Sequence, residues 1–97
     1  MPFSMTSGYS FTDSSVRLNA PNRSGVYGLY TASKWVYVGE SNDIQRRLLE
    51  HLAETGTCIK REAPGWFVYE LVSSDARVRR QNELIRELRP VCNERLG

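Results

Sequence analysis

Hydrophobic positions along the chain follow two spacings, and the shorter spacing predicts β-strands. Residues 26–30 (VYGLY) and 35–39 (WVYVG) are aromatic and β-branched runs joined by a short polar link. Such a pair predicts an antiparallel hairpin. A similar run at 66–72 follows a Pro-Gly turn and predicts a third strand.

Apolar residues at helical spacing follow the hairpin and predict a first helix. Ser41 and Asn42 are both good residues for the first position of a helix, and Gly56 ends the pattern after Thr55. The residues expected to face inward are Ile44, Leu48, Leu49 and Leu52. The sequence therefore predicts a helix from about 42 to 55.

A second helix is predicted between the polar residues 73–75 and Arg89, because Pro90 cannot continue it. At about 100° per residue, its apolar residues share one face. They are Val78, Leu84, Ile85 and Leu88. Gln81 lies at the centre of that face, and Glu83 points to the opposite, solvent side. A neutral amide on the inward face of such a charged helix needs an explanation.

The element order β-β-α-β-α predicts a small α+β domain, with a three-stranded antiparallel sheet flanked by helices. The 97 residues are enough for one core and too few for two. We expect residues 21–97 to form this domain. Residues 1–20, rich in Ser and Thr, are expected to be a partly ordered arm or an edge strand around residues 9–11.

Composition and charge narrow the function classes only a little. The net charge is +2, and arginines crowd both predicted helices. They are Arg46 and Arg47 on the first, and Arg77, Arg79, Arg80, Arg86 and Arg89 on or beside the second. Such arginines either follow a row of phosphates or form a solvated face with the glutamates between them.

The cysteines and the N-terminus predict a cytoplasmic protein without a membrane span. Cys58 and Cys92 have neither zinc-site spacing nor enough histidines to complete a site. A disulfide between them is an alternative that nothing in the sequence indicates, so we expect two reduced thiols. No apolar run approaches the length needed to cross a membrane. The first ten residues have neither the basic start nor the apolar core of a secretion signal.

Four side chains stand out as candidates for chemistry, although each has an ordinary structural explanation. Tyr27 and Tyr37 fall on neighbouring strands, where tyrosines usually serve packing. Arg47 and His51 are four residues apart and share a helix face, where such pairs are usually surface groups.

Taken together, these residues resemble the GIY-YIG nuclease family. The two name-giving triplets are matched by Gly25-Val26-Tyr27 and Tyr37-Val38-Gly39. The family's helical arginine falls on Arg47, and a histidine one turn later falls on His51. Its C-terminal pattern is matched by Ile85, Pro90 and Asn93. The resemblance covers residues 24–93.

This resemblance implies a divalent-metal-dependent DNA endonuclease that hydrolyses phosphodiester bonds. Tyr27 would be the general base, provided that a cation lowers its pKa, and Tyr37 would orient substrate or water. Arg47 would bind the phosphate through its planar fork of donors. His51 would donate to a phosphate oxygen or share in proton transfer. Gly25, Gly39 and Asn93 are expected to shape the site.

The metal position departs from the family pattern. Counting back from Pro90 and Asn93, the family's metal-binding Glu corresponds to Gln81. An amide keeps one carbonyl acceptor and loses the charge, so Mg²⁺ or Mn²⁺ is expected to bind weakly or not at all.

Four explanations for Gln81 remain open at this stage. The chain is a deliberately disabled variant, or a natural enzyme that recruits metal through another carboxylate such as Glu40 or one from a partner chain. Alternatively it is a DNA-binding module without catalysis, or Gln81 is simply a hydrogen-bonded inward amide. A protein-interaction domain is a further alternative that the composition permits.

The implied partner is DNA, in repair or restriction, with a homodimer or a partner protein supplying specificity. The candidate DNA contacts are Lys34, Arg46, Arg77 and Arg80.

Overall fold

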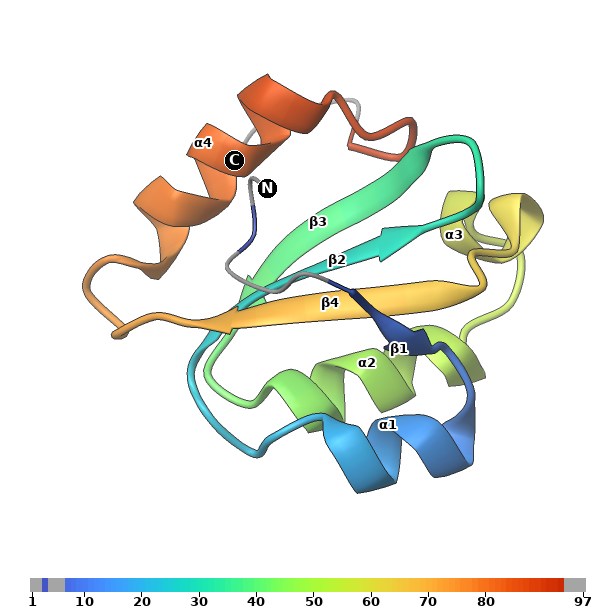
Figure 1. Ribbon diagram of the computed structural model, residues 1–97, viewed down its shortest axis with the longest axis horizontal. Coiled ribbons are helices and arrows are strands. Elements are labelled where there is room, and N and C mark those ends of the chain that lie inside the picture. Colours follow the sequence, from blue (N-terminus) through green and yellow to red (C-terminus); the bar gives the residue numbers. More distant parts are fainter. Residues whose placement is uncertain (1–2, 4–6, 94–97) are drawn as a thin grey trace.

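The computed structural model describes Phe3 and residues 7–93 (Figure 1). In chain order the elements are β1 (Tyr9–Ser10), α1 (Asp13–Asn19), β2 (Gly25–Tyr30), β3 (Trp35–Ser41), α2 (Ile44–Ala53), α3 (Cys58–Glu62), β4 (Trp66–Leu71) and α4 (Arg77–Leu88). The predicted α+β class is confirmed, and so is the hairpin formed by β2 and β3.

The sheet is antiparallel and has four strands rather than the predicted three, in the order β1-β4-β2-β3. The additional strand is the two-residue β1, which pairs with β4 at Trp66 and Phe67. It lies within the segment expected to be an arm or an edge strand. Its pairing gives hydrogen-bond partners to backbone groups along the outer side of β4.

Helices cover both faces of the sheet and make three layers (Figure 1). α1 and α2 lie on one face, and α4 lies on the other. The core on the α1/α2 face includes Tyr27, Leu29, Ile44, Leu48 and Phe67. The core on the α4 face includes Phe3, Val26, Val38, Leu84 and Ile85. The central strand β2 contributes to both cores, so it is fixed from both sides.

The first predicted helix exists but begins later than expected. Its N-terminal cap is Asp43 rather than Ser41 or Asn42, because the Asp43 carboxylate accepts a hydrogen bond from the Arg46 backbone N–H at 3.0 Å. The Ser41 hydroxyl instead donates to the Asp43 carbonyl at 3.0 Å. The helix ends at Ala53 rather than near residue 55.

The buried face of α4 is rotated relative to the predicted stripe. Val78 is 53% exposed, so its predicted inward position is wrong. On the neighbouring position, Arg77 donates to Glu40 on β3 at 2.7 Å, so in the first turn of α4 it is Arg77 that contacts the sheet. Gln81 is half-buried, one turn before the buried residues Leu84 and Ile85.

A disulfide joins Cys58 of α3 to Cys92 in the segment after α4, so the expectation of two reduced thiols is wrong. The partners are 34 residues apart in sequence, with Cα atoms 5.7 Å from each other. The backbone N–H groups of Val91 and Cys92 donate to β3, at the carbonyls of Trp35 and Val36. The C-terminal segment is therefore attached both to the edge strand and to α3.

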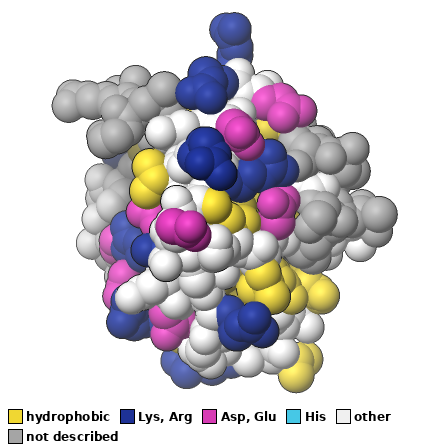
Figure 2. Space-filling model, turned by 90° about the vertical axis from the view of Figure 1, so that its left-hand side faces the viewer, with side chains coloured by type: hydrophobic (Ala, Val, Ile, Leu, Met, Phe, Trp, Pro, Cys, Tyr) yellow, Lys and Arg dark blue, Asp and Glu magenta, His cyan; other side chains and the backbone are white. Residues whose placement is uncertain are grey.

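The surface is mixed in charge. On the side shown in Figure 2, basic and acidic side chains are interspersed rather than sorted into one patch. No helix among residues 3 and 7–93 has the length and apolar character to cross a membrane.

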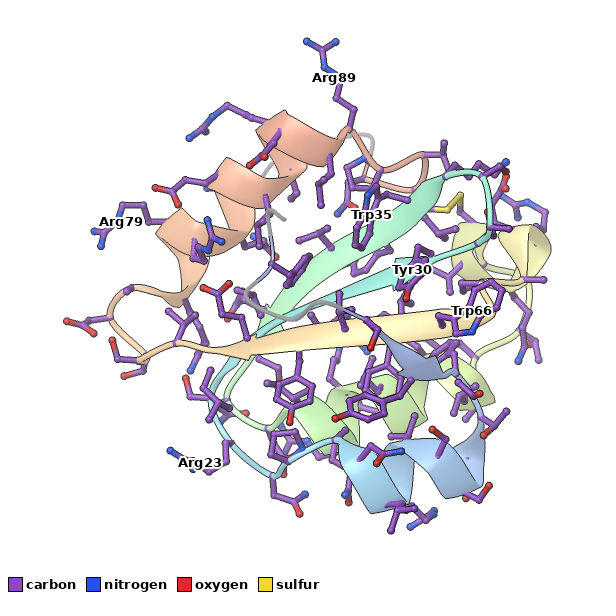
Figure 3. The ribbon with its side chains drawn as sticks, viewed as in Figure 1. Arg23, Tyr30, Trp35, Trp66, Arg79 and Arg89 are labelled. Atoms are coloured by element: carbon purple, nitrogen blue, oxygen red, sulfur yellow. A yellow bond between two sulfur atoms is a disulfide. The ribbon has the colours of Figure 1, made fainter. Side chains whose placement is uncertain are left out.

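One end of the sheet carries an aromatic cluster (Figure 3). Tyr30 contacts Trp35, with ring centroids 5.0 Å apart, and stacks on Trp66 at 5.8 Å. These three residues come from three neighbouring strands, so the cluster holds together the end of the sheet where the hairpin turns.

Candidate active site

The ring of Tyr27 lies directly over Gly39 on the neighbouring strand. The two residues are opposite each other in the β2–β3 register. A β-carbon at position 39 would collide with the phenol group, reaching 2.6 Å from Tyr27 Cζ. Gly39 is therefore required for close approach, since only glycine leaves this space to the ring.

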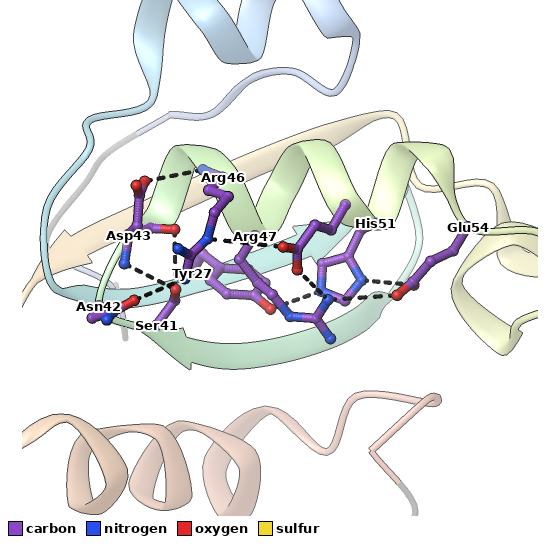
Figure 4. Close-up of polar contacts among 9 residues, drawn as sticks. Tyr27, Ser41, Asn42, Asp43, Arg46, Arg47, His51 and Glu54 are labelled. Atoms are coloured by element: carbon purple, nitrogen blue, oxygen red, sulfur yellow. Dashed lines mark hydrogen bonds and ion pairs between the residues drawn. The ribbon is translucent and has the colours of Figure 1, made fainter.

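Tyr27 and His51 form the centre of the site (Figure 4). Tyr27 Oη is 2.7 Å from His51 Nε2, and both residues are almost fully buried, at 1% and 3% exposure. Tyr37 completes an aromatic group, because its ring centroid lies 6.2 Å from that of Tyr27 and 5.3 Å from that of His51. The structure thus brings together three of the four candidate catalytic side chains in ring contact.

Burial raises the pKa of Tyr27 far above its ordinary value, and nearby Tyr37 adds to this. Arg47 opposes the shift but does not overcome it. Burial likewise raises the pKa of Tyr37. The expectation that a cation lowers the pKa of Tyr27 is therefore wrong in net direction, because removing the phenol from water costs more than Arg47 returns.

His51 is a buried group rather than a surface one, and its environment favours the neutral form. Burial lowers the pKa of His51, and the charge of Arg47 lowers it further. Glu54 partly opposes both effects and lies 3.3 Å from His51 Nδ1 through Oε1. The His51 side chain is only 2% exposed, yet it borders two cavities, and its two ring nitrogens contact Tyr27 and Glu54.

Arg47 lies one turn before His51 on α2, and its guanidinium contacts two carboxylates. Its Nη1 is 3.0 Å from Glu50 Oε1 and 3.5 Å from Glu54 Oε2. Burial opposes its charge, but interactions with Tyr27, Glu50 and Glu54 outweigh burial and raise the pKa of Arg47.

An open cavity of about 240 Å³ lies between α2, α3 and the C-terminal segment. Its lining contains Tyr37, Arg47, His51, Glu54 and the Cys58–Cys92 disulfide. A guanidinium, a phenol and a carboxylate thus line one open cavity.

The remaining shaping residues hold the strands in register. Asn93 bonds both backbone groups of Val38, accepting at 2.8 Å and donating at 2.9 Å. At Gly25 a β-carbon would collide with the Glu70 carbonyl oxygen on β4 and lie 2.9 Å from Ile44 Cδ1. These contacts fix the positions of β2 and β3, which carry Tyr27 and Tyr37.

The residues at the expected metal position do not fit a magnesium site. Magnesium takes hard, preferably anionic oxygen ligands. Gln81 is neutral, and its Nε2 donates to Asn82 Oδ1 at 3.3 Å. Glu40, the alternative carboxylate, is paired with Arg77. Across the described part of the chain, no cluster of three or more His, Cys, Asp or Glu side chains could hold a metal.

The candidate DNA-contacting residues are engaged with carboxylates or amides in this structure. Lys34 pairs with Glu62 at 2.6 Å, and Arg80 contacts Glu70 at 2.9 Å. Arg77 pairs with Glu40, as described above. Arg46 donates to Asn42 and stays 61% exposed. By contrast, Arg79 and Arg89 extend away from the sheet (Figure 3).

Glu54 is the site residue that sequence reasoning did not identify. It is the C-cap residue of α2, three residues after His51 and seven after Arg47, and its side chain contacts both. That spacing was available in the sequence, but a lone glutamate on a charged helix gives no signal without the burial of His51.

Comparisons with known proteins agree with this geometry. The pattern of the GIY-YIG catalytic domain matches residues 23–90. No curated protein matches the sequence. Among solved structures, the chain is similar to the GIY-YIG N-terminal endonuclease domain of UvrC from Thermotoga maritima.

Two of those UvrC structures set the degree of similarity. A tyrosine point mutant bound to its catalytic divalent cation is 24% identical, with a TM-score of 0.71 over 82% of this chain and 96% of that chain. The magnesium-bound domain is 23% identical, with a TM-score of 0.66 over 77% and 91% of the two chains. These values indicate a shared fold.

Proposed function

Because the chain belongs to the GIY-YIG family of catalytic domains, we propose that it acts on DNA as an endonuclease, hydrolysing phosphodiester bonds. We place this function in residues 21–97, with residues 1–20 as the N-terminal arm or edge strand. The observation that carries the proposal is the buried Tyr27–His51 hydrogen bond beside Arg47.

The site offers groups that suit two requirements of phosphodiester hydrolysis. The attacking water must lose a proton, and the charge that develops on phosphorus needs a cation. Tyr27 and His51 can pass a proton between them, since their polar atoms are in direct hydrogen-bond contact. Arg47 can present its planar donors to a phosphate in the cavity, and Tyr37 can orient the phosphate or the water.

The requirement for Mg²⁺ or Mn²⁺ is a further part of the proposal, and Gln81 limits it. A neutral amide already donating to Asn82 is a poor substitute for a carboxylate ligand. We therefore expect slow or undetectable cleavage by the chain as it stands, and metal-dependent cleavage by Gln81→Glu.

Gln81 also favours a second candidate function, a DNA-binding module without catalysis. In this case DNA binding falls as salt rises, because binding releases counterions from the phosphates. Arg47→Ala weakens binding, and Gln81→Glu does not introduce cleavage.

The test compares the wild-type chain and Gln81→Glu on linear, nicked and branched DNA with Mg²⁺ or Mn²⁺. Gln81→Glu combined with Arg47→Ala is the matched control, because it restores the carboxylate and removes the phosphate-binding group. Cleavage by Gln81→Glu that the control lacks supports the endonuclease. Intact DNA with every protein overturns it, and salt-dependent binding would then favour the binding module.

The proposed function also implies a biological pathway and a cellular location for the protein. We propose a role in DNA repair or restriction, with a second copy or a partner protein supplying specificity. A cytoplasmic location is also proposed. In a reducing cytoplasm, Cys58 and Cys92 would be free thiols. The disulfide would then form only under oxidising conditions, either transiently in the cytoplasm or in another compartment.

A further inference from the structure

Glu54 is in contact with two candidate catalytic side chains at once. Its Oε1 lies 3.3 Å from His51 Nδ1, and its Oε2 lies 3.5 Å from Arg47 Nη1 (Figure 4). The Glu54 side chain is 37% exposed, whereas His51 is 2% exposed. A partly exposed carboxylate is thus in contact with Nδ1 of a buried histidine.

The hydrogen positions follow from which groups can donate. An ionised carboxylate only accepts hydrogen bonds, so His51 Nδ1 must carry the hydrogen that faces Glu54. A neutral imidazole then has its lone pair on Nε2, and the Tyr27 hydroxyl must donate to it across 2.7 Å. The direction of the Tyr27–His51 hydrogen bond is thereby set by Glu54.

We propose that Glu54 is a positioning residue, which fixes the His51 tautomer so that Nε2 can accept the proton of Tyr27. The structural part of this inference stands on the contacts alone, and its catalytic part rests on the proposed function. The same carboxylate also contacts Arg47 at 3.5 Å, although Glu50 lies closer to Arg47, at 3.0 Å.

In the proton transfer, Tyr27 Oη takes a proton from the attacking water as its own O–H bond breaks. The released proton forms an N–H bond at His51 Nε2, and the ring becomes an imidazolium beside the Glu54 carboxylate. The hydroxide formed attacks phosphorus, and as the new P–O bond forms, the bond between phosphorus and one sugar oxygen breaks. The departing oxygen takes a proton from water in the open cavity, and His51 then returns its proton to solvent. This coupled transfer avoids a free phenolate, which burial of Tyr27 strongly disfavours.

Several other groups also act on His51. Tyr27 faces it from β2 and Tyr37 from β3, with ring centroids 5.6 and 5.3 Å away. Arg47 and Glu50 act on its charge from α2. From α3, Lys60 lines a second cavity that His51 also borders. Glu50 is the weakest of the charged groups that affect the pKa of His51, so it provides a matched control on the same helix.

The test uses histidine-selective ¹⁵N NMR of the full chain, in which His51 is the only histidine. Wild type is expected to show the Nδ1–H tautomer at neutral pH. Glu54→Ala should mix the tautomers and lower the pKa of His51 further. Glu54→Gln should keep the tautomer, because its carbonyl still accepts, yet lower the pKa. Glu50→Gln should keep the tautomer. An unchanged tautomer and titration in Glu54→Ala would overturn the proposal.

The catalytic part is tested in the Gln81→Glu protein. There Glu54→Ala should lower kcat by about tenfold or more, with KM little changed, and move the acidic limb of the pH–rate profile to lower pH. Glu54→Gln should restore part of the rate. An unchanged kcat and profile would overturn the catalytic role. If Gln81→Glu cuts no DNA, the endonuclease proposal fails, while the NMR result still decides the role of Glu54.

Discussion

Tyr27 occupies the space that a side chain at Gly39 would need. The two residues face each other across the β2–β3 ladder, and a β-carbon at position 39 would reach 2.6 Å from Tyr27 Cζ. Glycine at position 39, the last residue of the second triplet, is therefore required so that Tyr27 of the first triplet can pack against it. The family motif can be explained here as one steric unit built from two strands.

We expect Gly39→Ala to destabilise the protein by about 1–3 kcal/mol, because the added methyl group overpacks a buried contact. Chemical denaturation measures this change. Gly65→Ala is the matched control, since a β-carbon there has no heavy atom within 4 Å. Equal stability of the two variants would contradict the steric explanation.

His51 should make folding stability depend on pH. Its pKa is lowered in the folded state, mainly by burial, so the unfolded chain binds a proton at higher pH than the folded chain. The contribution is fully present above the unfolded pKa of about 6.5 and is lost as pH falls toward the folded value, with a slope of up to about 1.4 kcal/mol per pH unit. Urea unfolding from pH 7.5 to 5 measures it.

The comparison protein for this prediction is His51→Gln, which has no titrating group at that position. The stability of wild type should fall more steeply than that of His51→Gln below pH 6.5. Parallel loss in the two proteins would show that other groups cause the acid sensitivity.

Reduction of the Cys58–Cys92 bond should destabilise the protein by up to about 4 kcal/mol, from the entropy of closing a loop between residues 34 apart. Thermal unfolding with and without a reducing agent measures this. The double variant Cys58→Ser, Cys92→Ser should unfold at about the same temperature as the reduced wild type. Adding the reducing agent should not change that temperature. Two titratable thiols in protein purified under oxidising conditions would contradict the assignment.

Asn93→Ala should cost about 1–2 kcal/mol, because both backbone groups of Val38 lose a side-chain partner. Asn93→Asp should keep the hydrogen bond from the Val38 N–H but place a carboxylate oxygen against the Val38 carbonyl oxygen, so it separates the two contacts. Hydrogen exchange at the Val38 amide gives the direct readout. It should speed up in Asn93→Ala and stay slower in Asn93→Asp, and an unchanged rate in both would show that Asn93 does not protect this strand.

Much of the fold could be predicted because local pattern and tertiary packing agree. The runs at 26–30 and 35–39 are β-prone and pair with each other directly, so the hairpin needs no distant information. Residues Ile44 and Leu48 repeat at helical spacing and are fully buried. Capping was less predictable, since Ser41, Asn42 and Asp43 are all suitable caps and only geometry selects Asp43.

The features that were missed depend on distant partners or weak patterns. Helix α1 has only seven residues; Val16 is its buried residue, while Leu18 is 83% exposed, so no stripe marks it. Val78 is 53% exposed, while the neighbouring Arg77 contacts the sheet through Glu40, 37 residues away in sequence. Spacing alone gave no reason to join two cysteines 34 residues apart.

For the candidate site, the grouping of the residues could be predicted from the sequence, whereas their electrostatics could not. Resemblance placed Tyr27, Tyr37, Arg47 and His51 together, and the structure brings them to one cavity or its buried wall. Their electrostatics could not be predicted, because the direction of a pKa shift depends on burial. A phenol expected to be acidified by Arg47 is instead made less acidic by its removal from water.

The segment that follows α4 also determines how copies of the chain can meet. A bare outer strand offers a row of backbone donors and acceptors on which another polypeptide can add itself, and this is a common route to aggregation. Here the Val91 and Cys92 backbone and the Asn93 side chain occupy such groups on Trp35, Val36 and Val38. Shortening the chain before Val91 would therefore leave backbone groups on the outer side of β3 unpaired and exposed. The shortened protein should become prone to self-association through strand addition.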